Sequence, residues 1–117
     1  MEALDSYGVR YVTLFAFSTE NWTRPESEVK ALMELLREVI RDETRRLHEK
    51  GVRLRHIGRM DRLSPELQEA IREGVELTKD NTDITVNVAF DYGGRAEIID
   101  AVRAIVADGL SPEAVTE

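Results

Sequence analysis

The sequence predicts an α/β fold, in which a parallel sheet carries helices on both faces. Three segments rich in β-branched and aromatic residues alternate along the chain with three segments of helical periodicity. Such alternation favours parallel pairing of the strands through crossover connections, which are normally right-handed. The first of these strands is apolar at successive positions, as expected when both faces of a sheet are covered.

Composition indicates a globular protein with one domain over residues 1–117. Hydrophobic residues make up 42% of the chain and charged residues 33%, and cysteine is absent. The lack of cysteine excludes disulfides and thiolate metal sites, and no stretch approaches the ~20 apolar residues of a membrane span. The net charge of −7 argues against broad nucleic-acid binding, which depends on neutralising phosphates with Lys and Arg. We therefore expect a cytoplasmic protein without a nucleic-acid partner.

The first strand is expected over residues 9–17 (VRYVTLFAF), and a long helix should follow it. Thr23 can cap that helix, Glu26 stands three residues later as in a capping box, and Pro25 suits the first turn. Apolar residues then recur at helical spacing as far as Gly51, which is a typical helix stop.

The remaining elements complete the alternation. A second strand is expected over residues 52–58, a second helix from Ser64, and a third strand over residues 83–92, where apolar and polar residues alternate. A third helix should end near Gly109, and residues 111–113 look like the start of a fourth. Three strands leave two open sheet edges, so we expect a partial domain that is incomplete at both ends.

Three polar loops should meet at the carboxyl ends of the strands, where ligands bind in open α/β sheets. These loops are residues 18–25 (STENWTRP), 58–64 (GRMDRLS) and 91–95 (DYGGR). We expect the second and third loops to be mainly structural, with Arg59 and Arg62 solvated.

The first loop has the composition of a site for an anion with an apolar portion. A helix N-terminus and Arg24 favour negative charge, while Ser18 and Asn21 supply neutral hydrogen bonds. Glu20 could bind a cation, orient a partner or cap the backbone, and Trp22 offers a flat apolar wall. The alternative is a structural turn in which Trp22 belongs to the core.

Other site motifs are absent from the sequence. Neither a P-loop nor a dinucleotide-binding glycine motif occurs in it. His48 and His56 fall on different expected elements, and each is interpreted as a surface or packed histidine rather than a metal ligand.

The segments FAFSTENWTRP, VRLRHIG and NVAFDYGGRAEI, in this order and at this spacing, resemble the cis-prenyltransferases, above all the bacterial undecaprenyl diphosphate synthases (isoprenyl transferases). The similarity covers essentially the whole chain. It implies a non-Rossmann parallel α/β fold and a transferase of isoprenoid biosynthesis. Such an enzyme condenses isopentenyl diphosphate with an allylic diphosphate, such as farnesyl diphosphate, into a cis-polyprenyl diphosphate such as undecaprenyl diphosphate, a lipid carrier for the cell wall.

The resemblance also implies Mg²⁺ as cofactor, a homodimer, and a product delivered to the membrane by an enzyme that is cytoplasmic or peripheral at the membrane. Two family motifs, an Asp-Gly-Asn-Gly-Arg-Trp loop and a C-terminal Arg-x-x-Gly/Ser-Glu-x-Arg-x-Ser segment, do not occur in these residues. We therefore expect the metal ligands outside this chain. We also expect the chain to be the central fragment of the enzyme and to be inactive alone.

The resemblance assigns residues to three roles. Asn21 matches the position credited with accepting the proton; because an amide is a weak base, our hypothesis is that it orients a diphosphate oxygen or a water that does so. The matched substrate contacts are Ser18, Thr19, Glu20, Trp22 and Arg24. The matched wall of a product tunnel is Ala16, Leu32, Leu35, Leu36, Ile84, Val86 and Val88.

Two other functions stay open from the sequence. One is a non-catalytic partner subunit of the same family, although the retained polar residues of the first loop argue against it. The other is a generic α/β phosphate-binding module, which would explain the alternating elements but not the long motifs. Product length depends on the depth of the tunnel, and the sequence leaves it open.

Overall fold

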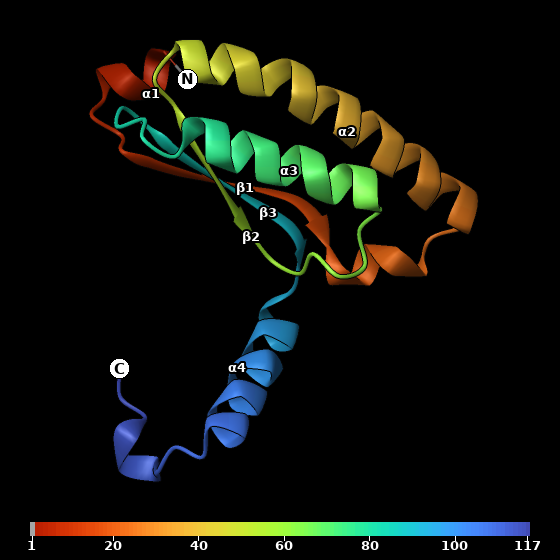
Figure 1. Ribbon diagram of the computed structural model, residues 1–117, viewed down its shortest axis with the longest axis vertical. Coiled ribbons are helices and arrows are strands. Elements are labelled where there is room, and N and C mark those ends of the chain that lie inside the picture. The colour runs from red at the N-terminus through yellow and green to blue at the C-terminus, as the bar shows by residue number, and fades with distance from the viewer. Residues whose placement is uncertain (1) are drawn as a thin grey trace.

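A computed structural model of the protein describes residues 2–117. Its helices and strands follow one another along the chain as shown in Figure 1. They are α1 (Glu2–Ser6), β1 (Tyr11–Ser18), the 3₁₀ turn η1 (Thr19–Thr23), α2 (Glu26–Glu49), β2 (Arg53–Ile57), α3 (Pro65–Thr78), β3 (Thr85–Tyr92), α4 (Gly94–Asp108) and the 3₁₀ turn η2 (Pro112–Ala114).

The three strands form one parallel sheet in the order β1-β3-β2, as the alternation predicted. Val86 of the central strand lies between Val12 on β1 and Leu54 on β2. The register of β1 shifts between Phe15 and Phe17. A bulge at this point lets Phe17 turn toward the helices although it follows directly after a residue that also faces them.

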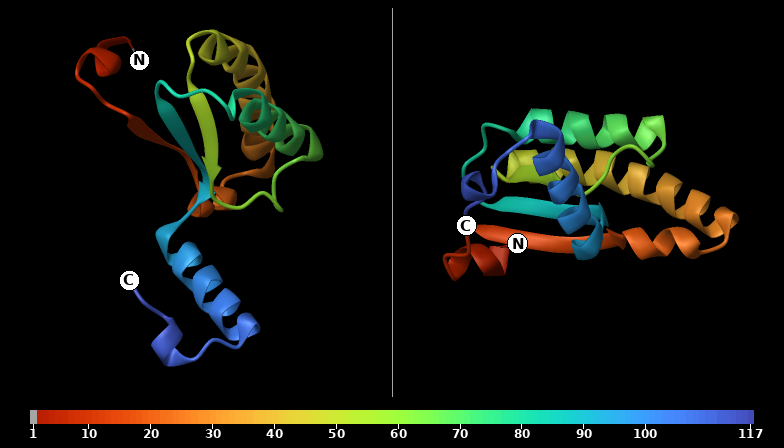
Figure 2. Two further views of the ribbon diagram at one scale, coloured as in Figure 1. Left: turned by 60° about the vertical axis from the view of Figure 1, so that its left-hand side comes forward. Right: turned by 90° about the horizontal axis from the view of Figure 1, so that it is seen from below.

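The helices α2 and α3 lie side by side on one face of the sheet (Figures 1 and 2). Their apolar stripes share a core with the strands, because Met33 of α2 and Leu67 and Ile71 of α3 pack with Phe17 and Phe90. A second cluster, Val52, Ile84 and Val86, fills the space near the other end of the strands.

The two crossovers have opposite hands. From β1 to β2 the chain moves two positions across the sheet, and from β2 to β3 it moves back by one. Because α2 and α3 occupy the same face, only one of these connections can be right-handed. The expectation of right-handed crossovers therefore holds for one of the two, and the shared core of α2 and α3 is what brings both helices to this face.

The opposite face of the sheet carries no helix in the part of the chain that the structure describes. The parallel sheet with helices is confirmed, but the helices packed on it cover one face. Helix α4 leaves the sheet and projects away from it (Figure 2), and its apolar Ile98, Val102 and Val106 are exposed, as are Tyr11 and Phe15 on β1.

Three local predictions need correction. The helix α2 begins after Pro25, which makes no side-chain cap, and Thr23 Oγ1 instead donates to the Glu20 carbonyl over 2.9 Å. The expected capping box of Thr23 and Glu26 is therefore wrong. The fourth helix is only the short turn η2, and α1 was not predicted. No described helix is long and apolar enough to cross a membrane.

Candidate functional site

The three loops do meet at the carboxyl edge of the sheet. The backbone N–H of Arg59 donates to the carbonyl of Asp91 over 3.0 Å. Gly58, with φ of +123°, lies so close to the end of β3 that a Cβ there would be 2.9 Å from the Asp91 carbonyl oxygen. A Cβ on Gly93 would overlap the Thr19 side chain. Backbone approaches of this kind hold the loops after β1, β2 and β3 in mutual contact.

The turn η1 is locked by hydrogen bonds between its own residues. Ser18 N–H donates to Asn21 Oδ1 over 2.8 Å, and Glu20 N–H donates to Ser18 Oγ over 3.2 Å. These bonds form a capping box, which satisfies backbone donors at the start of a helical turn. Since the amide oxygen of Asn21 is engaged by the backbone, its NH₂ group is the part that remains for a ligand.

Trp22 is held from three sides. Its Nε1–H donates to Asp91 Oδ1 over 2.7 Å, and the guanidinium carbon of Arg62 lies 5.1 Å from the ring centroid. Phe17 meets the indole edge-on at 5.3 Å and stacks on Phe90 at 5.2 Å. The alternative that Trp22 packs on the core is thus partly correct, because the side chain is half-buried and contacts the main cluster.

The expectation that Arg62 is solvated is wrong, because its guanidinium is bound to Asp91. Its Nε donates to Asp91 Oδ2 over 3.1 Å and its Nη2 to Asp91 Oδ1 over 2.5 Å. Asp91 is 0% exposed. Sequence reasoning missed this carboxylate because strand alternation places it on the face away from the helices. The signal that was available is an acidic residue at the end of an otherwise apolar buried strand.

Arg59 also has a partner rather than free solvent. It forms a bidentate ion pair with Asp100 of α4, with Nε–Oδ2 and Nη2–Oδ1 distances of 3.0 and 2.8 Å. The hydrogen bond from Arg59 lowers the pKa of Asp100. A hydrogen bond to Glu97 raises the pKa of the Tyr92 hydroxyl. The expectation of a solvated Arg59 is therefore wrong, and this pair ties α4 to the loop after β2.

The other predicted contacts occupy the rim of the site. Arg24 is exposed between η1 and α2, and its N–H donates to the Asn21 carbonyl over 3.2 Å. Glu20 is exposed, whereas Thr19 lines a cavity of about 170 Å³ beside Gly93. The first turn of α2 carries the acidic side chains Glu26 and Glu28, which oppose an anion there. The positive charge of the first loop therefore comes from Arg24.

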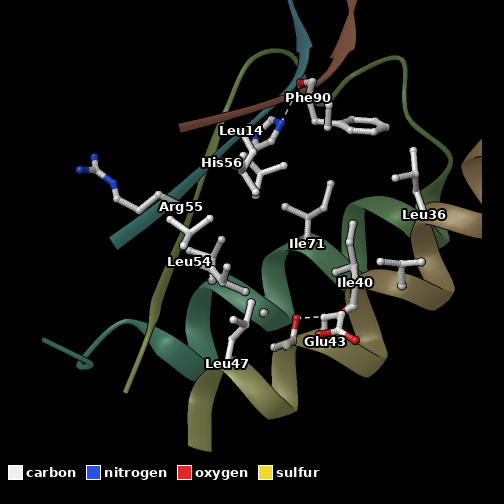
Figure 3. A pocket seen from close by; sticks show the side chains of 17 residues that line it. Leu14, Leu36, Ile40, Glu43, Leu47, Leu54, Arg55, His56, Ile71 and Phe90 are labelled. Atoms are coloured by element: carbon white, nitrogen blue, oxygen red, sulfur yellow. Dashed lines mark hydrogen bonds between the residues drawn. The ribbon is translucent and has the colours of Figure 1, made fainter. Parts of the chain in front are cut away.

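An apolar pocket of about 310 Å³ lies between the sheet and the two helices (Figure 3). Of the predicted tunnel residues, Ala16, Leu36, Val86 and Val88 line it. The lining residues that sequence reasoning missed are Leu14, Val39, Ile40, Leu47, Leu54, His56, Ile71, Val75 and Phe90, with Glu43, Thr44, Arg55 and Gly74. The helical spacing of α2 would have found several of them.

Three predicted tunnel residues lie elsewhere. Leu32 packs against the cluster around Phe17, and Ile84 belongs to the second cluster with Val52. Leu35 is 57% exposed. Leu32 and Leu35 stay outside the pocket because the stripe of α2 that faces the sheet is narrower than the apolar surface of this helix, and Ile84 stays outside because it packs with Val52.

His56 is a packed side chain, as expected. Its Nε2 lies 3.0 Å from the Phe90 carbonyl oxygen, beside the pocket (Figure 3). Among the side chains that the structure describes, no group of three His, Asp or Glu residues is placed to hold a metal ion. Glu20 shares a hydrogen bond with Ser18, and Asp91 is engaged by Arg62 and Trp22. These residues do not fit a Mg²⁺ site.

Comparison with known proteins places the chain in a family. A family model described as "Putative undecaprenyl diphosphate synthase" matches residues 1–117. The isoprenyl transferase of Ralstonia nicotianae is 47% identical over 119 residues, which are 100% of this chain and 46% of that protein. The isoprenyl transferase of Clostridium perfringens is 48% identical over 104 residues, covering 89% of this chain and 41% of that protein.

Solved structures show the same fold. A probable undecaprenyl diphosphate synthase from Campylobacter jejuni matches with a TM-score of 0.89 and 36% identity, over 100% of this chain and 56% of that one. Lavandulyl diphosphate synthase from Lavandula x intermedia, solved with dimethylallyl diphosphate, matches with a TM-score of 0.90 and 29% identity. The match covers 98% of this chain and 51% of that one. The chain spans about half the length of these relatives. It therefore belongs to the prenyltransferase family of undecaprenyl diphosphate synthases and isoprenyl transferases, as its motifs indicated.

Proposed function

We propose that the protein carrying this chain condenses isopentenyl diphosphate with an allylic diphosphate, such as farnesyl diphosphate, into a cis-polyprenyl diphosphate such as undecaprenyl diphosphate. One observation carries the proposal beyond family membership: a polar turn with an exposed arginine stands directly beside an apolar pocket. Ala16 lines that pocket and lies two residues before Ser18, where the polar turn begins. A ligand with a diphosphate head and a hydrocarbon tail needs both environments next to each other.

The turn η1 suits the head group. Arg24 is exposed and can form charge-assisted hydrogen bonds with a phosphate, and arginine's planar fork matches phosphate oxygens. The NH₂ group of Asn21 lies on the same short turn and can donate to a second oxygen. The capping box keeps these two residues in a single arrangement before the ligand arrives.

The pocket suits the tail. Its walls are mainly aliphatic side chains from α2, α3 and the helix-facing side of the strands. Each methylene transferred from water to such a surface contributes ~0.8 kcal/mol. The binding free energy of a growing prenyl chain would therefore become more favourable as the chain lengthens. Glu43 and Thr44 add polar atoms to part of the lining.

The proposed reaction breaks the C–O bond of the allylic diphosphate and forms a C–C bond to the double bond of isopentenyl diphosphate. A proton then leaves the new chain, and a diphosphate oxygen or a water takes it. Asn21 orients that acceptor through its NH₂ group, consistent with the engagement of its own oxygen by Ser18 N–H. Arg24 stabilises the charge of the departing diphosphate.

Magnesium, a homodimer and a cytoplasmic position against the membrane complete the proposal, and they rest on the resemblance of the sequence to the family. Magnesium would neutralise diphosphate charge. Because the carboxylates that the structure describes do not fit a metal site, we expect the metal ligands to come from residues outside positions 1–117. No step above is assigned to the ion.

A chimaera tests the proposal. Residues 1–117 replace the matched segment of the Ralstonia nicotianae isoprenyl transferase, and elongation of farnesyl diphosphate with labelled isopentenyl diphosphate is measured. We expect polyprenyl products, and Arg24→Gln should lower kcat/KM roughly tenfold to a hundredfold, the value of a charged hydrogen bond. Arg41→Gln, on the exposed side of α2, is the matched control and should leave elongation unchanged.

Two outcomes would contradict this reasoning. A folded chimaera that makes no product would favour the non-catalytic alternative. Elongation by the 117-residue chain alone would show that the expected requirement for outside segments is wrong.

A further inference from the structure

Three segments of the site meet on one carboxylate that solvent does not reach. Asp91 is the penultimate residue of β3, Trp22 belongs to the turn after β1, and Arg62 belongs to the loop after β2. The Asp91 side chain is 0% exposed; its Oδ1 accepts hydrogen bonds from Trp22 and Arg62, and its Oδ2 accepts one from Arg62. Carboxylates are almost never fully buried unless they are paired, so the hydrogen bonds from Trp22 and Arg62 are what allow Asp91 to be buried here.

We propose that Asp91 is the positioning residue of the site: together with Arg62 it clamps the indole of Trp22 and thereby holds the turn that presents Asn21 and Arg24. The inference deepens the proposed function and rests on it.

The backbone of Asp91 is shaped for this contact. Its φ is +52°, and within residues 2–117 it is the one non-glycine residue with positive φ. Asp and Asn are among the residues that tolerate this left-handed conformation. This conformation interrupts the alternation of side chains near the C-terminal end of β3, and it allows the carboxylate to lie among the loops.

The clamp acts on two sides of the indole. Asp91 Oδ1 accepts the Nε1–H at 2.7 Å, while the Arg62 guanidinium lies over the ring at 5.1 Å from its centroid. The same guanidinium binds both Asp91 oxygens, so loss of the carboxylate would release Arg62 as well as Trp22. A fork-shaped donor on a carboxylate sets the orientation of both groups.

The position of the indole is transmitted to the turn because η1 has only five residues. Asn21 immediately precedes Trp22 and receives the Ser18 N–H on its side chain, and its carbonyl receives the Arg24 N–H. A rotation of Trp22 therefore displaces the neighbours on both sides. Misplacement of reacting groups by about 1 Å can cost on the order of 100-fold in rate.

The neighbouring ion pair provides a matched control. Arg59 stands on the same loop as Arg62 and is also bidentate to a carboxylate, but its partner Asp100 belongs to α4. Asp100→Asn removes a similar interaction from the same loop without touching Trp22 or η1.

The test uses the chimaera described above. The indole ¹H–¹⁵N signal of Trp22 is assigned by its disappearance in Trp22→Phe, and kcat and KM are measured for each variant. Asp91→Asn keeps an acceptor for Trp22 and tolerates the left-handed backbone, so it should retain the indole signal and lose less than about tenfold in kcat/KM. Asp91→Ala should shift the indole signal and lose up to about 100-fold. Asp100→Asn should leave the indole signal in place.

A double variant shows whether Asp91 acts through Trp22. If it does, Asp91→Ala with Trp22→Phe should lose no more kcat/KM than Trp22→Phe alone. Multiplied losses would overturn the proposal, as would a folded Asp91→Ala with the parental indole signal and rate. Should Asp91→Ala fail to fold, Arg62→Gln breaks the clamp from a side chain that is 35% exposed and must shift the same signal. An inactive parental chimaera would refute the proposed function, whereas the indole signal would still test the clamp.

Discussion

Replacing Gly58 with alanine should destabilise the protein at the edge that carries the site. Gly58 joins β2 to the loop of Arg59 and Arg62, and it has a φ of +123°. An L-residue at this position would be strained whatever its surroundings. Its Cβ would also overlap the Phe90 carbonyl oxygen and lie 2.9 Å from that of Asp91. Both obstacles are backbone atoms of the central strand, so neither can move aside as a side chain would.

The magnitude follows from these two terms. A residue held in such a sparsely populated backbone region costs about 1–3 kcal/mol, and an added methyl in a filled space costs about 1–3 kcal/mol. We expect a loss of roughly 2–5 kcal/mol in the free energy of unfolding, since relaxation of the loop relieves part of the sum. For a protein of 150–250 residues, this corresponds to a fall in Tm on the order of 10 °C.

Thermal unfolding of the chimaera, followed by calorimetry, measures the effect. Gly94→Ala is the control, because a Cβ at Gly94 meets nothing within 4 Å and alanine suits the first turn of α4. It should raise stability by up to about 1 kcal/mol. A Gly58→Ala protein that unfolds within a degree or two of the parent would refute the close-approach argument.

Further predictions concern the core, the tether of α4 and the pocket. Leu67→Ala, at a site that is 0% exposed, should cost about 2–5 kcal/mol of stability in denaturant unfolding, whereas the half-exposed Leu77→Ala should cost under about 0.5 kcal/mol; equal losses would contradict the assigned core. The lowered pKa of Asp100 means that its pairing with Arg59 stabilises α4 fully above the ordinary value of 3.8 and is lost as the pH falls through the lower folded-state value. The protection of the α4 amides against hydrogen exchange, corrected for the intrinsic pH dependence of exchange, should therefore fall in acid, and Asp100→Asn should abolish that fall. Val88→Phe narrows the pocket and should shorten the products seen by chromatography; unchanged lengths would exclude the pocket as the tail site.

Sequence periodicity predicted most of the elements because each one depends on local pattern. The strands and the helices α2, α3 and α4 lie within a few residues of their expected ranges. The capping box was placed one turn too late because Ser18 with Asn21 and Thr23 with Glu26 have similar local chemistry. The structure uses the pair at the end of β1, where Ser18 lies beside Tyr92 of β3.

The site was predicted only where its residues are adjacent in the sequence. Ser18, Asn21, Trp22 and Arg24 form one continuous motif, so their grouping was visible. The carboxylate of Asp91 is 69 residues from Trp22, and Arg62 comes from a third loop. No local pattern reports that these side chains share hydrogen bonds.

The sequence by itself determined the alternation of strands and helices, the polar turn before α2 and the family to which the chain belongs. The tertiary structure alone decided that both crossover helices pack on one face, that α4 stands away from the sheet, and that Arg62 turns inward to Asp91. The physical reason is that periodicity and motifs encode which side of an element is apolar and which residues are neighbours in the chain. The choice of partner for each surface, and for each buried charge, is made only when distant segments compete for the same space.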